Sequence, residues 1–147
     1  MRCSKASCFF AILGAGLAAA SAQAQIHRQY VYMYDFAFSI NPPGEAVVQA
    51  VVNPGDEVIW FAYHDLHNTV ACVGQAEFWE SPLMFHGDTF AYTFTIPGVY
   101  TYYCAPHGAD NGDGTADGMQ GTVTVLPTPG VLGVLAAGGA WCARRRR

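Results

Sequence analysis

Two proline–glycine pairs divide the middle of this chain into short apolar segments and limit the folds that it can adopt. Pro54-Gly55 separates "AVVQAVV" from "EVIWFAY", and Pro97-Gly98 separates "DTFAYTFTI" from "VYTYYC". Short segments rich in β-branched and aromatic residues, bounded by such turn residues, are typical of strands. No segment shows a convincing helical period, so the pattern predicts an all-β fold.

The rest of the central region follows the same pattern. "QYVYMYDFAF", "NTVACV" and "GTVTVL" are further candidate strands, and Val123 and Val125 alternate with polar residues in the last of them. "GQAEFWESPLMFHGD" is irregular and could hold a short helix. In "DTFAYTFTI", one face of the strand is expected to carry Phe90, Tyr92, Phe94 and Ile96. Six to eight short strands in about 100 residues predict a β-sandwich.

Residues 1–24 have the composition of a secretory signal peptide. Arg2 and Lys5 precede an apolar run over residues 9–20, and Ala22-Gln23-Ala24 forms a small-residue cleavage site. A buried N-terminal helix is the alternative, but the run is short and rich in glycine and alanine. We therefore expect an exported protein in the periplasm or cell envelope.

Residues 127–147 form a distinct tail. A proline- and glycine-containing stretch leads to 13 apolar or small residues, 131–143, and the chain then carries four arginines, 144–147. Such a segment is short for a hydrocarbon core of about 30 Å. The tail resembles C-terminal sorting signals of the PEP-CTERM type, although its proline motif has no glutamate. We expect a sorting or anchoring tail that could tether the domain to the membrane, with a packed terminal helix as the alternative.

The domain between these ends, residues 25–126, is strongly acidic. It contains one cationic side chain, Arg28, and all eleven Asp and Glu residues of the chain, which gives it a net charge of −10. Such a surface repels nucleic acid and favours cationic partners. We therefore expect no nucleic-acid partner, and a redox partner with a basic docking face is compatible with this charge.

Soft metal ligands concentrate in the last third of the domain. Cys104 and His107 lie three residues apart where a predicted strand ends, and Met119 precedes the final strand. Upstream, His64 and His67 have a spacing that could bind zinc, but a strand would direct them to opposite faces. One Cys, two His and a weak Met ligand form the donor set of a blue-copper site.

The motifs around these residues resemble the cupredoxin family, of the plastocyanin and pseudoazurin kind. The matching features are "PGDEVIW", "HN" at 67–68, "PGVYTYYC", the C-x-x-H spacing and "GM-x-G-x-V" at the exit, over about residues 29–126. The resemblance implies a Greek-key β-sandwich and one type 1 copper ion. It implies copper ligation by His67, Cys104, His107 and Met119, with Asn68 fixing the ligand loops.

The spacing before Met119 departs from the plastocyanin pattern. Eleven residues, "GADNGDGTADG", separate it from His107, where such proteins have only a few. The insertion could loop out and return Met119 to the axial position, or it could leave a centre with three protein ligands. Its Asn111, Asp113 and Asp117 resemble a calcium loop, but no bidentate Glu closes it.

The remaining candidates are assigned from their local context. Met33 and Met84 are expected in the core, His86 in a turn and Cys72 as an unpaired thiol if Cys104 binds metal. His27, third after the predicted cleavage site, could take part in a separate Cu(II) site with a free N-terminal amine.

The expected function is one-electron transport by a mononuclear copper protein, with copper storage or a structural envelope role as the alternative. An enzyme is not expected, because multicopper oxidases flank the blue-copper cysteine with histidines. Here the neighbours of Cys104 are Tyr103 and Ala105.

Overall fold

The computed structural model describes residues 25–127, so the predicted signal peptide and residues 128–147 of the predicted tail lie outside the described part. Residues 25–127 contain no helix, and so no helix among them could span a membrane. They form eight strands, in agreement with the predicted all-β class: β1 (Arg28–Tyr34), β2 (Ala37–Ser39), β3 (Ala50–Val52), β4 (Glu57–Ala62), β5 (Val70–Ala71), β6 (Thr89–Thr93), β7 (Gly98–Asp110) and β8 (Ala116–Val125).

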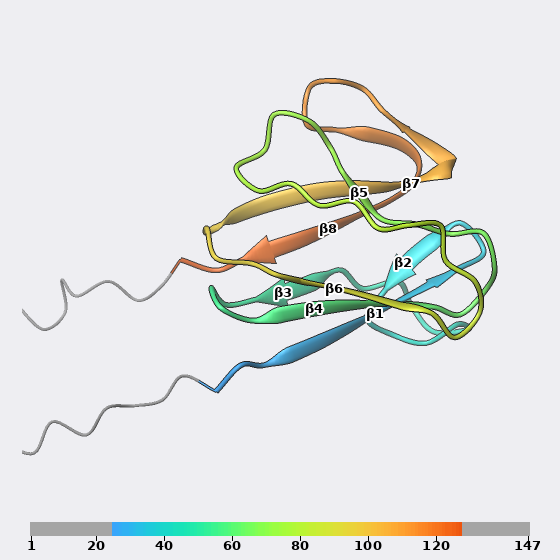
Figure 1. Cartoon of the computed structure of the whole chain (residues 1–147), viewed down its shortest axis with the longest axis horizontal. Coiled ribbons are helices and arrows are strands. Elements are labelled where there is room, and N and C mark those ends of the chain that lie inside the picture. Colours follow the sequence, from blue (N-terminus) through green and yellow to red (C-terminus); the bar gives the residue numbers. More distant parts are fainter. Residues whose placement is uncertain (1–24, 128–147) are drawn as a thin grey trace, which may run out of the picture.

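The strands form two four-stranded sheets, which make the predicted β-sandwich (Figure 1). One sheet has the order β2-β1-β4-β6 and the other β3-β8-β7-β5. β1 and β4 are parallel, as are β3 and β8, whereas the other neighbours are antiparallel. Because parallel neighbours need a crossover connection, the chain passes repeatedly between the two sheets.

Aromatic side chains fill much of the space between the sheets. Trp60 on β4 stacks on Trp79 with ring centroids 5.5 Å apart, and Tyr102 on β7 meets Trp60 edge-on. Trp79 belongs to the irregular segment that could have held a short helix. The segment forms no helix and is a loop that pairs with residues 67–71.

Strand alternation explains most of the observed burial. Phe94 is fully buried, Phe90 and Tyr92 are half-buried, and Val123 and Val125 face the core as predicted. Ile96 is 44% exposed, so its predicted place on the inner face was wrong. β6 ends at Thr93, before the turn at Pro97-Gly98, so strand alternation does not extend to Ile96.

The two described ends of the chain lie at the same end of the sandwich (Figure 1). There, Val125 near the end of β8 pairs with Gly98 at the start of β7. Cys104 lies six residues further along β7, which corresponds to about 20 Å of extended strand. The predicted metal ligand is thus far from the point where the chain leaves the domain.

The Pro54-Gly55 turn is stabilised by a buried carboxylate. Asp56 accepts hydrogen bonds from the backbone N–H groups of Asn53 (2.8 Å) and His27 (3.1 Å). Burial acts to raise the pKa of Asp56, but these N–H donors outweigh it and hold the pKa below the usual value of 3.8. The ionised carboxylate therefore connects the segment just before β1 to the turn before β4.

We predict that Asp56→Asn lowers the free energy of unfolding of the metal-free protein by about 1–3 kcal/mol at pH 7, because an amide cannot satisfy all these donors. The folded-state pKa lies below the unfolded one, so the stabilisation is present above pH 3.8 and lost as pH falls through the folded-state pKa. Urea unfolding at several pH values measures it. An equal loss in the exposed Glu45→Gln control would contradict the assignment.

Candidate metal centre

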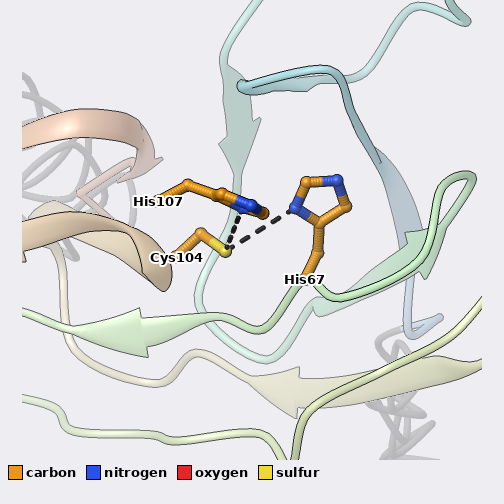
Figure 2. A group of neighbouring side chains, drawn as sticks. All are labelled: His67, Cys104 and His107. Atoms are coloured by element: carbon orange, nitrogen blue, oxygen red, sulfur yellow. Dashed lines mark hydrogen bonds between the residues drawn. The ribbon is translucent and has the colours of Figure 1, made fainter.

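Three predicted ligands point toward one another (Figure 2). The Sγ of Cys104 lies 3.6 Å from Nδ1 of His67 and 3.4 Å from Nδ1 of His107. The candidate ligand atoms all lie within 4.8 Å of one another, and Cys104 and His67 are buried. Within residues 25–127 this is the only such cluster of three or more His, Cys, Asp or Glu side chains.

Strand geometry directs Cys104 toward the other two ligands. Tyr102 and Cys104 are buried on the inner face of β7, whereas Tyr103 between them is half-buried, because successive strand side chains point to opposite faces. The regular pairing of β7 with β8 ends at Tyr103 and resumes at Gly108. This irregularity frees the four residues 104–107 to turn, so that His107 faces the same point as Cys104.

His67 is positioned by the loop that contains Trp79 and Met84. His67 and Met84 exchange two backbone hydrogen bonds, of 3.3 and 2.7 Å, in an isolated antiparallel bridge. The next residue but one, Thr69, accepts a bond from the indole N–H of Trp79 at 3.0 Å and donates its backbone N–H to Ser81 Oγ at 3.0 Å. Sequence reasoning missed this support because the segment has no regular period.

Asn68 connects the two ligand-bearing segments directly. Its Oδ1 accepts a 2.7 Å hydrogen bond from the backbone N–H of Ala105, the residue after Cys104. Asn68 is only 8% exposed, so the bond is largely shielded from water. The expectation that Asn68 fixes the ligand loops is confirmed by this bond, which joins residues 37 positions apart.

The surroundings of His67 and Cys104 favour the neutral forms of both side chains when no metal is present. Burial, followed by the charge of His107, lowers the pKa of His67. Burial also raises the pKa of the Cys104 thiol, against the opposing effect of its hydrogen bonds. Metal ligation requires a thiolate and neutral imidazoles, so binding of an ion here would release the thiol proton of Cys104 and use the neutral imidazole of His67.

The eleven-residue insertion before Met119 forms a β-hairpin. β7 continues to Asp110 and β8 starts at Ala116, with Gly108 paired to Gly118. A Cβ atom on Gly108 would lie 2.6 Å from the Asp117 carbonyl oxygen, so the hairpin closes tightly at its base. The chain therefore loops out after His107 and returns beside it, and Met119 is 1% exposed in the same buried cluster as Cys104.

Two of the three acidic side chains of this hairpin, Asp110 and Asp113, accept hydrogen bonds. Asp113 Oδ1 accepts from the N–H and the hydroxyl of Thr115 at 3.0 and 2.6 Å, and these bonds lower its pKa. Asp110 accepts from the backbone N–H of Val73 at 2.8 Å and of Gly112 at 2.8 Å. These contacts shape the turn and attach the hairpin to the loop after β5.

The other residues considered as ligands lie outside the cluster. His64 contacts Asp35 with a 3.1 Å separation between Nδ1 and Oδ1, and His86 is exposed in a turn. Met33 and Met84 are buried in the core, as expected. Cys72 is a free buried thiol, and burial raises its pKa to about 11.

The spacing of the donor atoms suits one transition-metal ion. Bonds of about 2.0 and 2.3 Å, typical of zinc to imidazole nitrogen and thiolate sulfur, would separate the two donors by about 3.7 Å at an angle of 120°. The observed sulfur–nitrogen distances are 3.6 and 3.4 Å. A soft thiolate combined with two imidazoles is the set that copper uses in electron-transfer sites.

Comparison with known families agrees with this donor set. A family model described as copper binding proteins of the plastocyanin/azurin family matches residues 47–126, more than half of the chain. The chain belongs to this family. The matched segment includes the Cys104, His67 and His107 cluster, so the family's metal and the donor chemistry of the site agree.

Individual relatives match over shorter stretches. Chloroplastic plastocyanins of Oryza sativa subsp. indica and Hordeum vulgare are each 39% identical over 56 residues, which is 38% of this chain and 29% of the relative. The match thus spans less than a third of these relatives.

A solved structure shares the fold at lower identity. A copper-containing nitrite reductase from Thermus scotoductus SA-01 matches with a TM-score of 0.52 and 24% identity, over 67% of this chain and 22% of that one. An oxidized amicyanin variant matches with a TM-score of 0.48 and 24% identity, over 73% and 87% of the two chains.

We predict that Asn68→Ala lowers the free energy of unfolding of the metal-free protein by about 1–2 kcal/mol, because the N–H of Ala105 loses its acceptor. Copper affinity should fall about 10- to 100-fold, as is typical when a group that orients a ligand is removed. Urea unfolding and chelator competition measure the two effects. Asn111→Ala, at an exposed hairpin position, is the control, and an equal loss there would contradict this role.

Proposed function

We propose that the protein is an exported, mononuclear type 1 copper protein that carries one electron at a time. The observation that supports this most strongly is the convergence of one buried thiol and two imidazole nitrogens within 4.8 Å in a domain of a copper-binding family. When bound, copper would supply a centre that alternates between two oxidation states.

The proposed copper ligands are His67, Cys104, His107 and Met119. Cys104 and the two imidazoles present their donor atoms to a common point. For Met119, the support is its burial and the hairpin register that returns it to His107. Cys104 would provide the strongest bond, and Met119 would act as a weak axial ligand that tunes the redox potential.

The surrounding residues suit rapid electron transfer because they hold the ligands in place before metal binds. Asn68 fixes the loop of Cys104, and the backbone bridge to Met84 fixes His67. His107 is partly exposed, whereas His67 is 3% exposed. An electron would therefore enter and leave on the His107 side, where a partner can approach most closely.

An enzymatic role has less support than electron transport. The nitrite reductase that shares the fold is much longer than the matched segment, which covers only 22% of it. Cys104 is flanked by Tyr103 and Ala105, rather than by histidines that could bind further copper ions. Copper storage is the alternative, and reversible redox chemistry distinguishes it from electron transport.

The proposed partners are redox proteins with a basic docking face, since the domain has a net charge of −10. The proposed location is the periplasm or cell envelope, based on the signal-like residues 1–24. The apolar residues 131–143 and the arginines after them would tether the domain to the membrane.

We predict that the protein with one equivalent of Cu(II) develops an intense visible charge-transfer band, which bleaches with ascorbate and returns on oxidation. Cys104→Ser should abolish the band because it removes the thiolate, whereas Cys72→Ser should retain it because Cys72 lies outside the cluster. Absorption spectroscopy measures this. A colourless copper complex of the unaltered protein would exclude the electron carrier and favour storage.

We predict that Met119→Leu retains the coloured centre and raises its redox potential, because loss of a weak thioether donor destabilises Cu(II) more than Cu(I). Met84→Leu is a matched control, since Met84 is equally buried at 1% and its backbone pairs with His67. Potentiometric titration of the three proteins measures the change. A shift confined to Met84→Leu would transfer the axial role to Met84.

A further inference from the structure

The turn between β1 and β2 contains a phenylalanine, Phe36, at a position where the backbone geometry of the turn favours glycine. Tyr34 pairs with Ala37, so Asp35 and Phe36 form a two-residue hairpin turn. Their φ angles are 45° and 108°, and positive φ at both positions is the pattern of a type I′ turn. Such turns favour Asn-Gly or Asp-Gly, so a phenylalanine occupies the position where glycine is expected.

Burial of the Phe36 side chain does not explain this choice, because the residue is 71% exposed. The phenyl ring instead meets the imidazole of His107, with ring centroids 5.0 Å apart and an interplanar angle of 81°. An edge-to-face arrangement at this distance is a favoured contact between aromatic rings. The turn therefore places an aromatic ring against the proposed ligand His107, although glycine at this position would remove the backbone strain.

The turn itself is held from a neighbouring loop. His64 Nδ1 lies 3.3 Å from the Asp35 backbone nitrogen and 3.1 Å from Asp35 Oδ1, and either contact ties the turn to the loop after β4. The backbone N–H groups of Tyr63 and His64 donate to the Met33 carbonyl at 3.0 and 3.2 Å. The direction of the Phe36 ring is thus fixed by the same loop that leads to His67.

His107 needs such support more than His67 does. His67 is 3% exposed and is held by the backbone bridge to Met84, whereas His107 is partly exposed at the irregularity between Tyr103 and Gly108. The imidazole of His107 contacts two other rings. One is the phenyl ring of Phe36, and the other is the imidazole of His67, whose centroid lies 4.9 Å from that of His107. Without the phenyl ring, the imidazole would have more freedom to turn its Nδ1 away from Cys104.

We propose that Phe36 is a positioning residue for His107, and that the β1–β2 turn keeps an unfavourable backbone to place its ring there. The proposal rests on the proposed ligand role of His107. It predicts that stability and metal retention respond in opposite directions when Phe36 is replaced by the residue that the turn prefers.

The test compares three variants of the full chain. Phe36→Leu keeps a side chain at positive φ but removes the aromatic contact, Phe36→Gly removes both, and Phe36→Tyr keeps both. In the metal-free state, Phe36→Gly should have a folding equilibrium constant about tenfold higher than Phe36→Leu, which is 1.4 kcal/mol. Urea unfolding measures this difference. A Phe36→Gly variant less stable than Phe36→Leu would overturn the claim of backbone strain.

Metal retention gives the second measurement. Copper loss to a chelator should be about fivefold faster from Phe36→Leu and Phe36→Gly than from the unaltered protein, and within twofold for Phe36→Tyr. Phe78→Leu, at another exposed aromatic (58% exposed), should not change the rate. Unchanged copper loss from both Phe36→Leu and Phe36→Gly would overturn the positioning role.

A direct measurement needs no metal. Nuclear Overhauser effects between the Phe36 and His107 rings should be present in the metal-free protein and in Phe36→Tyr. Their absence from the unaltered protein would overturn the contact. Failure of the copper assignment is separate, since the unaltered protein would then form no coloured centre, whatever residue occupies position 36.

Discussion

The metal centre depends on an interruption in the pairing of β7 with β8, after which the pairing resumes. β7 and β8 pair regularly through Tyr103, lose register over the next four residues, and pair again from Gly108 to Asp110. The regular part belongs to the core, and the second part forms the projecting hairpin (Figure 1). Cys104 and His107 lie in the interruption, so their positions are fixed from both sides by hydrogen-bonded strands.

This arrangement explains how a long insertion is compatible with a small metal site. A flexible loop of eleven residues would place Met119 at no defined distance from His107. A paired hairpin removes that freedom, because Gly108 and Gly118 face each other across its base. Gly121 follows on β8, where a Cβ atom would lie 2.6 Å from the Tyr102 ring, so the glycine spacing around Met119 accommodates close packing at both points.

The sequence predicts the all-β class and most of the strands, because alternating apolar residues and turn residues are local signals. Cys104 and His107 could also be predicted, since one strand end carries both. His67 required the family resemblance, because it lies in a loop 37 positions before Cys104. The order of the segment around Trp79 and Met84 could not be predicted, since it comes from contacts with residues 67–71 and not from a period of its own. The contact of Phe36 with His107 could not be predicted from the sequence, because it exists only in the folded chain.

The position of the chain ends has a consequence for how the domain can be combined with other modules. Both ends of the described chain lie at one end of the sandwich (Figure 1), where Val125 pairs with Gly98, about 20 Å of extended strand from the proposed metal ligand Cys104. A fused domain, surface linker or affinity handle joined directly to residue 25 or residue 127 would start far from the cluster of His67, Cys104 and His107. The domain can therefore be immobilised through either of these two ends, for example on an electrode, with its His107 side still open to solution.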